Sequence, residues 1–366
     1  MPDPRVKKLA EVLVKYSLEL KPGETFVIST SAAADELSLA VYEQAVLAGA
    51  HVHSRISISG SNEVYYKNAS NAQLDYVSPI SRYYYEKFDA LLNIEAQTNT
   101  RALSGVDPQK MRRSQQANKE VIETFMQRMA TRELKWAMTV YPTNASAQEA
   151  DMSLTEYENF VYGAGLLDLD DPVQAWREEG QRQRGVIAWL DGRKSAVLKG
   201  ANIDLTLSLD GRKFQEASGK LNFPDGEIYT SPIEDSVNGW VRFGYPAIFG
   251  GREVEDIELW FENGKIVKEK AGKGQEFLST MLDSDEGSRY LGEWGIGTNY
   301  NIQKFTKNML FDEKIGGTIH LAVGGGFPEV GGKNKSAIHW DMLCDMADSE
   351  VTIDGDLFYK DGKIVV

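Results

Sequence analysis

The sequence predicts an α/β N-terminal domain over residues 1–192 and a mainly antiparallel-β (α+β) domain over residues 193–366. Its 366 residues suffice for two domains at about 150 residues each. The first half alternates short apolar runs with longer amphipathic ones, which is typical of strands alternating with helices. In the second half, Asp-Gly and Asn-Gly pairs stand beside alternating apolar residues, which is typical of β-hairpins.

The N-terminal elements follow from apolar spacing and from the breakers between the runs. Helical spacing predicts helices over residues 6–18, 34–48, 108–129 and 172–187. Short apolar runs predict strands over residues 25–29, 51–58, 88–95 and 134–141. Because helices separate these strands, we expect a mostly parallel sheet.

The C-terminal elements follow from turn residues. Hairpin turns are predicted at Asp210-Gly211, Asn263-Gly264, Asp354-Gly355 and Asp361-Gly362. Alternating apolar residues predict strands over 203–209 and 257–261, and helical spacing predicts a helix over 276–282.

Charge and cysteine content restrict the possible partners. With 40 basic and 54 acidic residues, the net charge of −14 argues against binding nucleic acid and favours cationic partners, including metal ions. The single cysteine, Cys344, excludes an intrachain disulfide and a multi-cysteine zinc site, so any metal must use His and carboxylates. Since there is no long apolar run and no signal-peptide core at the start, we expect a cytoplasmic protein without a membrane partner.

Two i, i+2 pairs that contain histidine stand on predicted strands. His339 and Asp341 share one face of an apolar strand, whereas Trp340 and Met342 take the other. An imidazole and a carboxylate on one edge form half of a metal site, although a hydrogen-bonded pair in a core has the same spacing. The other pair, His51 and His53, is more typical of a half-exposed strand.

Two glutamates and a third histidine extend the candidate site. Glu227 follows a turn at the start of a strand, and His320 ends the segment Gly-Gly-Thr-Ile-His. Glu293 stands among glycines and apolar residues, where a charge is costly unless paired. Taken singly, each glutamate also fits a surface turn.

Together these motifs resemble the M29 family of metallo-aminopeptidases, the thermophilic group that includes aminopeptidases T and S. The resemblance rests on residues 225–232, 291–293, 312–320 and 339–341, and on N-terminal segments 141–143 and 147–153. It implies that Glu227, Glu293, His320, His339 and Asp341 bind two divalent ions. It also implies a homodimer that removes N-terminal residues from short peptides with metal-activated water.

The charges of the implied ligands suit a two-ion centre. Three carboxylates and two neutral imidazoles supply three negative charges against four positive ones, and a bridging hydroxide would neutralise the remainder. Two ions about 3.5–4 Å apart activate a water and polarise the scissile carbonyl. Oxygen and nitrogen ligands without thiolate suit Zn²⁺, Co²⁺ or Mn²⁺.

One position departs from the family pattern. Many members have a catalytic tyrosine seven residues after the histidine that matches His320, where this chain has Phe327. Since loss of an oxyanion donor costs about 10²–10³ in turnover, either another donor replaces that hydroxyl or the chain is a slow peptidase. Lys314, Tyr229 and Tyr300 are candidate donors, and Glu234 and Asp235 are candidate bases, although surface charge explains these two carboxylates better.

Two other functions remain open. His320, His339 and Asp341 could form the facial triad of a mononuclear Fe²⁺ dioxygenase, but such a triad does not need Glu227 and Glu293. A peptide-binding relative with weak or no catalysis would explain Phe327, but it has no evident need for three clustered carboxylates.

Overall fold

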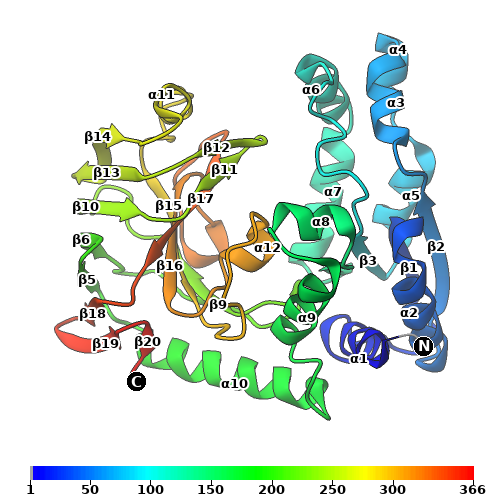
Figure 1. The fold of residues 1–366 in the computed structure, drawn as a ribbon, viewed down its shortest axis with the longest axis horizontal. Coiled ribbons are helices and arrows are strands. Elements are labelled where there is room, and N and C mark those ends of the chain that lie inside the picture. Colours follow the sequence, from blue (N-terminus) through cyan, green and yellow to red (C-terminus); the bar gives the residue numbers. More distant parts are fainter. Residues whose placement is uncertain (1–2) are drawn as a thin grey trace. The chain divides into compact units, whose positions relative to one another are not determined.

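The computed structural model describes residues 3–366, which form two compact units (Figure 1). The first unit contains the residues up to Trp176 together with Gly219–Pro224. The second contains Arg177–Ser218 and Asp225–Val366. Helix α10 (Pro172–Leu190) runs through the division, and the predicted domain boundary at residues 192/193 lies just beyond its end. The division into 1–192 and 193–366 therefore stays a prediction.

The first unit is built on a parallel sheet, as predicted. Its strands lie in the order β2-β1-β3-β4-β8 and all their pairings are parallel. They are β1 (Thr25–Ser31), β2 (His51–Ser57), β3 (Ala90–Glu95), β4 (Lys135–Val140) and β8 (Asn222–Phe223). The sequence did not predict β8, which pairs with β4 although about eighty residues separate them.

Helices accompany the strands of this unit. They are α1 (Pro4–Val12), α2 (Asp35–Leu47), α3 (Ser61–Asn68), α4 (Asn71–Leu74), α5 (Pro79–Lys87), α6 (Pro108–Ala117), α7 (Lys119–Ala130), α8 (Asn144–Glu149) and α9 (Leu154–Ala164), with short π and 3₁₀ turns at Leu13–Ser17 and Ala32–Ala34. The prediction of one helix over 108–129 is wrong, because the helix breaks at Asn118. The Asn118 side chain donates to the Ser114 carbonyl, which offers the backbone a local alternative to a continued helix.

Both faces of the parallel sheet are covered. Val27 and Leu91 pair in register and pack with aromatic residues of α5 and α7. Phe26 and Leu92 take the opposite face and are fully buried. A parallel sheet needs this cover because its strands are apolar on both sides.

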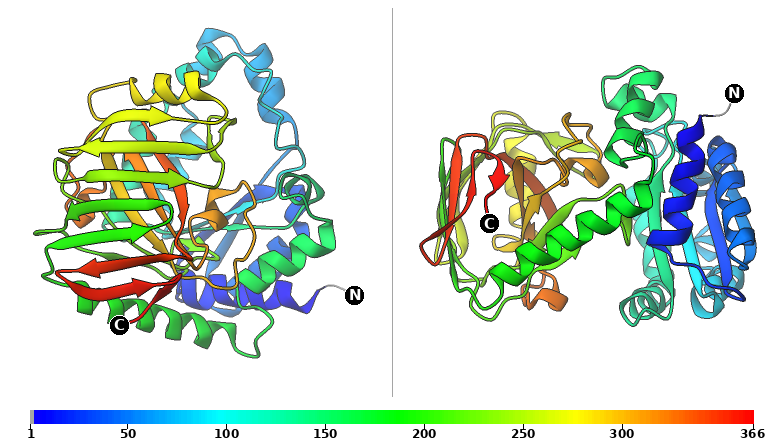
Figure 2. Two further views of the ribbon diagram at one scale, coloured as in Figure 1. Left: turned by 60° about the vertical axis from the view of Figure 1, so that its left-hand side comes forward. Right: turned by 90° about the horizontal axis from the view of Figure 1, so that it is seen from below.

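The second unit consists of antiparallel sheets, as predicted. The larger has the order β14-β13-β10-β6-β5-β18-β19-β20 (Figure 2, left). Its strands are β5 (Ser195–Gly200), β6 (Ile203–Ser208), β10 (Asn238–Phe243), β13 (Ile257–Glu262), β14 (Lys265–Lys270), β18 (Ser349–Ile353), β19 (Asp356–Lys360) and β20 (Lys363–Ile364).

A five-stranded sheet has the order β17-β16-β15-β9-β7, and β11 pairs with β12. These strands are β7 (Gln215–Ala217), β9 (Glu227–Thr230), β15 (Leu291–Gly297), β16 (Thr318–Gly324), β17 (His339–Asp345), β11 (Ala247–Phe249) and β12 (Arg252–Val254). Helices α11 (Gln275–Leu282) and α12 (Met309–Asp312), a 3₁₀ turn at Pro328–Val330 and the part of α10 from Arg177 onward complete the unit.

Three of the four predicted hairpin turns connect neighbouring strands. Asn263-Gly264 joins β13 to β14, with positive φ angles of 48° and 81°, and the turns at 354–355 and 361–362 have the same form. The hairpin predicted at Asp210-Gly211 is wrong, since this turn leads from β6 to β7 in the other sheet. A turn reverses the chain locally, but tertiary packing decides where the next strand pairs.

The two larger sheets share one hydrophobic core. Trp294, Leu321 and Trp340 of the five-stranded sheet lie in the same buried cluster as Leu205 and Leu259 of the larger sheet. The five-stranded sheet therefore has one face in the core and one face free for other uses. Within residues 3–366, no helix has both the length and the apolar character needed to span a membrane.

Candidate metal centre

The second face of the five-stranded sheet gathers the predicted site residues. The register places Gly295 opposite His320, Ala322 opposite both Glu293 and Asp341, and Gly324 opposite His339. Side chains opposite one another in an antiparallel pair lie on the same face. Glu293, His320, His339 and Asp341 therefore share this face, which we call the polar face.

Glu227 joins them from β9. It pairs with Gly297, two residues from Gly295, so it also belongs to the polar face. Small residues stand between the ionisable ones, and at Gly295 a Cβ atom would lie 2.0 Å from the His320 ring. The glycines thus leave the space that the imidazole and carboxylates occupy.

The ionisable side chains form two groups, each with ligand atoms within 4.8 Å of one another. One group is Glu227, Glu313 and His320, and the other is Glu293, His339 and Asp341. All five predicted ligands are brought together, and Glu313 is an addition. In the sequence Glu313 lies within residues 312–320, one of the segments that resemble the M29 family. Its signal was a run of three charged residues, Asp312-Glu313-Lys314, that ends four positions before the start of a buried strand at Thr318.

Glu293 links the two groups. Its Oε1 lies 3.4 Å from His320 Nε2, and its Oε2 lies 3.0 Å from His339 Nε2. His320 Nε2 also lies 3.5 Å from Glu227 Oε2, and His339 Nε2 lies 3.4 Å from Asp341 Oδ1. A carboxylate that faces two imidazoles with separate oxygens connects the two groups of candidate ligands.

The glycine-rich loop after β16 orients one imidazole. His339 Nδ1 lies 2.7 Å from the Gly325 carbonyl, which can only accept a hydrogen bond. Nδ1 therefore carries the proton, and Nε2 of a neutral His339 presents a lone pair to the carboxylates. Fixing a ligand imidazole through its other nitrogen is common at metal sites.

Several buried polar atoms at the centre have no hydrogen bond within the described chain. They are Glu227 Oε2, both His320 ring nitrogens and Asp341 Oδ1. Leaving buried polar atoms unpaired is costly. Oxygen and imidazole nitrogen atoms that face one another without a shared hydrogen bond fit a divalent cation between them.

The pKa values show how closely the charges interact. Burial lowers the pKa of His320, but Glu293, Glu227 and Asp341 outweigh it and raise the pKa to about 10. For His339, burial is likewise outweighed by Asp341 and Glu293, which raise its pKa to about 11. Burial raises the pKa of Glu227 to about 8, although Lys314 acts in the opposite direction. This is an environment that strongly favours positive charge next to the carboxylates.

Lys314 supplies one such charge. It is 1% exposed, and its Nζ lies 2.6 Å from Glu227 Oε1, 3.7 Å from Asp225 Oδ1 and against Glu313. These contacts commit the ammonium group to three carboxylates. Lys314 therefore neutralises and holds the carboxylates, a role that the sequence had not indicated.

The other predicted site residues lie as follows. Phe327 packs against His339, with ring centroids 4.9 Å apart. Glu234 is bound to Arg212 at 2.6 Å and to the Lys333 amide at 2.7 Å, which leaves it engaged elsewhere. The Tyr300 hydroxyl donates to the Gly362 carbonyl at 3.0 Å.

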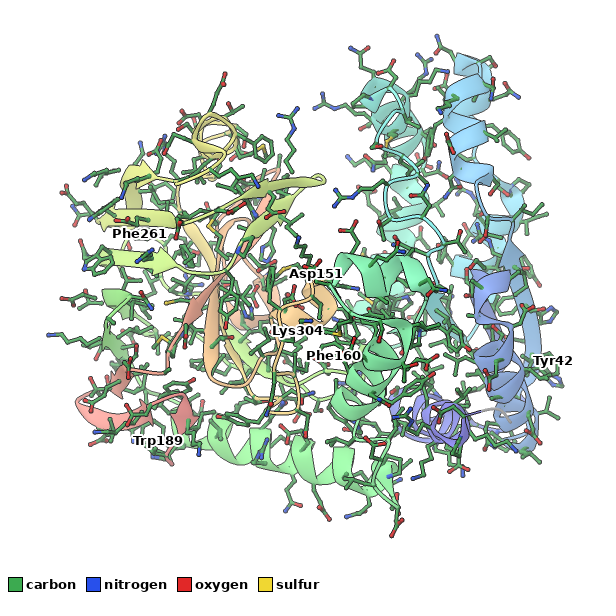
Figure 3. All side chains as sticks on the ribbon, in the orientation of Figure 1. Tyr42, Asp151, Phe160, Trp189, Phe261 and Lys304 are labelled. Atoms are coloured by element: carbon green, nitrogen blue, oxygen red, sulfur yellow. The ribbon has the colours of Figure 1, made fainter. Side chains whose placement is uncertain are left out.

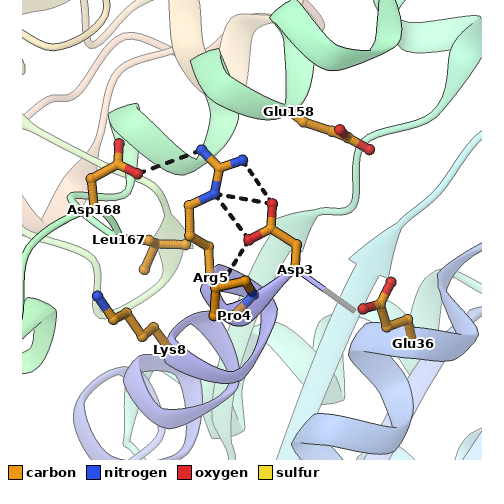
Figure 4. A pocket seen from close by; sticks show the side chains of 8 residues that line it. All are labelled: Asp3, Pro4, Arg5, Lys8, Glu36, Glu158, Leu167 and Asp168. Carbon is orange, nitrogen blue, oxygen red and sulfur yellow. Dashed lines mark hydrogen bonds and ion pairs between the residues drawn. The ribbon is translucent and has the colours of Figure 1, made fainter. Parts of the chain in front are cut away.

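The first unit offers no comparable centre within its described residues. His51 and His53 lie on the edge strand β2, where neither belongs to a group of candidate ligands. A pocket beside α1 is lined by charged side chains that bind one another, Arg5 to Asp3 and to Asp168 (Figure 4). The candidate metal chemistry is therefore in the second unit.

Buried carboxylates and imidazoles gathered on one sheet face are suited to hold a divalent metal. Residues 2–365 match the family described as thermophilic metalloprotease (M29). The chain belongs to this family, and it is accordingly a metallopeptidase that uses a divalent metal.

Individual proteins agree with this assignment. Aminopeptidase 2 of Geobacillus stearothermophilus is 27% identical, over 97% of this chain and 94% of its own length. The structure of wild-type AmpT from Thermus thermophilus is similar over 99% of both chains, with a TM-score of 0.85 and 24% identity. A 2,5-dihydroxypyridine dioxygenase from Pseudomonas putida KT2440 has a TM-score of 0.60 and 14% identity over 100% of this chain and 99% of its own. The two structural similarities show the shared fold.

Proposed function

We propose that the chain is an aminopeptidase that removes N-terminal residues from short peptides with two divalent ions. Glu227, Glu293, His320, His339 and Asp341 would hold them. The observation that carries this proposal is that Glu293 directs its two oxygens at two different imidazoles. A single ion would need only one of these groups.

The charges near the centre support two ions. Besides Glu227, Glu293 and Asp341, the carboxylates of Asp225 and Glu313 lie beside Lys314. With neutral imidazoles, five carboxylates and one ammonium leave four negative charges, which equals the charge of two divalent ions. Such a cluster can be buried, whereas the same carboxylates without cations would repel one another.

The chemistry divides between ions and protein. When bound, a pair of divalent ions activates water and polarises a carbonyl. The protein's part is to hold the ligands, through the Gly325 contact of His339 and the Lys314 contacts of Glu227. A divalent ion can also bind the uncharged α-amino group that distinguishes the first residue of a peptide.

The dioxygenase alternative is not favoured. His320, His339 and Asp341 could form a facial triad, but His320 stands in the group with Glu227 and Glu313 rather than with Asp341. The family assignment is also to metalloproteases. A weak peptide-binding relative would not need five clustered carboxylates.

Hydrolysis of blocked and free substrates tests the function. We expect the metal-loaded chain to hydrolyse aminoacyl p-nitroanilides with a free α-amino group and to leave their N-acetylated counterparts intact. The measurement is release of p-nitroaniline, with oxygen uptake on a dihydroxypyridine as the test of the alternative. Hydrolysis of both substrate forms, or oxygen uptake without hydrolysis, would contradict the proposal.

We also propose that the chain forms a homodimer through a surface that we call the α2–β2 surface. It consists of exposed apolar side chains of helix α2 and the edge strand β2, namely Leu39, Tyr42, Val46, Leu47 and Ile56. Leu39 and Leu47 are 72% and 74% exposed, and Tyr42 points outward from α2 (Figure 3). Because β2 ends its sheet, its unpaired edge can pair with the same edge of a second copy.

Sedimentation equilibrium checks the dimer. We expect a mass twice the 40.8 kDa of the chain, and a shift toward the monomer in Leu47→Glu, because a charge would then be desolvated at the interface. Leu169→Glu is the matched control, since Leu169 is 49% exposed in the same unit and lies outside the surface. A monomeric parent chain, or equal behaviour of both variants, would contradict this interface.

The native metal among Zn²⁺, Co²⁺ and Mn²⁺ and the cytoplasmic location stay predictions from the sequence. So do the absence of a nucleic-acid partner, from the net charge of −14, and the absence of a membrane partner.

A further inference from the structure

A tyrosine stands on the polar face beside the candidate ligands. Tyr229 is two residues from Glu227 on β9, so the two side chains lie on the same face. In the sheet register Tyr229 is opposite Gly295, which is in turn opposite His320. Because Gly295 has no side chain, nothing on β15 separates the Tyr229 ring from the His320 side of the centre.

The Tyr229 hydroxyl has no hydrogen-bond partner in the described chain. The other polar groups beside the ligands are engaged: Lys314 binds carboxylates, and Ser231 donates to the Gly292 carbonyl at 2.6 Å. The Tyr229 side chain is only partly buried. Its hydroxyl is therefore both free and accessible to a ligand.

Neighbouring rings fix the position of Tyr229. Its ring packs edge-on against Phe327 at a centroid distance of 5.3 Å, and Phe327 packs against His339. The Phe327 amide is in turn bound to Ser231 Oγ at 3.0 Å. The three rings form a connected wall from β9 to the ligand imidazole, so Tyr229 needs little reorganisation to meet a substrate.

The hydroxyl also keeps its proton. A phenol carries its proton at neutral pH, because its ordinary pKa is about 10. A protonated phenol at an otherwise carboxylate-rich centre is a hydrogen-bond donor and can stabilise negative charge that develops on an oxygen.

We propose that the Tyr229 hydroxyl donates a hydrogen bond to the substrate carbonyl oxygen while water attacks the peptide bond, supplying the donor that Phe327 lacks. This inference rests on the proposed aminopeptidase function. The water oxygen forms the new bond to the carbonyl carbon, and the carbon–nitrogen bond breaks. One proton of the water passes to the leaving amine, and Tyr229 retains its own.

Removing this hydroxyl tests the proposal. In Tyr229→Phe the ring stays, so we expect kcat to fall by about 10²–10³ with little change in KM, as for other oxyanion donors. Tyr300→Phe is the matched control, since the Tyr300 hydroxyl is bound to the Gly362 carbonyl. Metal content and circular dichroism report whether the centre and fold remain intact.

A binding measurement separates this role from a structural one. Calorimetry compares the affinity of metal-loaded chains for a tetrahedral phosphonate dipeptide analogue and for a product amino acid. We expect Tyr229→Phe to weaken phosphonate binding by about the same factor as kcat/KM and to leave amino-acid binding unchanged. Equal weakening of both ligands, or of neither, would overturn the proposal.

The adjacent ring allows a rescue. In Tyr229→Phe/Phe327→Tyr the hydroxyl moves to the neighbouring ring, and we expect at least about a tenfold recovery of kcat over Tyr229→Phe. No recovery with intact metal content would overturn the assignment of the hydroxyl to the carbonyl. If the parent chain hydrolyses no aminoacyl amide, the proposed function fails. If the parent is active and Tyr229→Phe equals it, only this inference fails.

Discussion

Removal of divalent metal with a strong chelator is expected to abolish peptide hydrolysis, and Co²⁺, Zn²⁺ or Mn²⁺ is expected to restore it. The reason is that carboxylate and imidazole atoms at the centre lack partners until a cation binds. Elemental analysis at saturation should give two ions per chain. The control is the same chelator saturated with Zn²⁺ beforehand, which should leave activity intact.

The same treatment should leave the first unit folded. All candidate ligands lie between residues 227 and 341 in the second unit, whereas Phe26 and Leu92 of the first unit are buried without contribution from a metal site. Hydrogen exchange of β1, β3 and β4 should be equally slow with and without chelator. Hydrolysis that resists the chelator, or saturation at one ion per chain, would contradict the two-ion proposal.

Glu293→Gln is expected to reduce turnover by at least about 10²–10³, the factor that corresponds to several kcal/mol of transition-state stabilisation by bound metal. Glu293 is the only residue whose two oxygens face imidazoles of both groups among the described ion pairs. An amide has the same shape, but it removes one charge and replaces one ligand oxygen by NH₂. We therefore expect loss of metal from the chain as well as loss of turnover.

Turnover and metal content must be measured together in this variant. Glu350→Gln is the control, because Glu350 pairs with Lys360 on the exposed side of β18 in the same unit. The variant should still fold, since the polar face is separate from the core side chains Trp294 and Trp340. Normal turnover with normal metal content would show that Glu293 is not a ligand.

The face of each side chain on a strand could be predicted from the sequence. His339 and Asp341 lie on one face and Trp340 and Met342 on the other, because the alternation of a strand depends only on local backbone geometry. Three hairpin turns and the helix over 276–282 could also be predicted, because turn residues and helical spacing likewise act over a few neighbouring residues. The motif resemblance identified the five candidate ligands, which the fold brings together.

Tertiary structure decided which of these local features meet. No spacing indicates that one oxygen of Glu293 faces His320 and the other His339, because β15, β16 and β17 must first pair in a specific register. Glu313 and Lys314 lie within residues 312–320, one of the segments that carry the family resemblance. Both lie beside Glu227, however, which stands at least 86 positions earlier in the chain. The return of β8 to β4 and the path from Asp210-Gly211 into the other sheet were missed for the same reason. Turn and strand propensities act over a few neighbouring residues, whereas strand order and the approach of distant charges are set by packing of the whole unit.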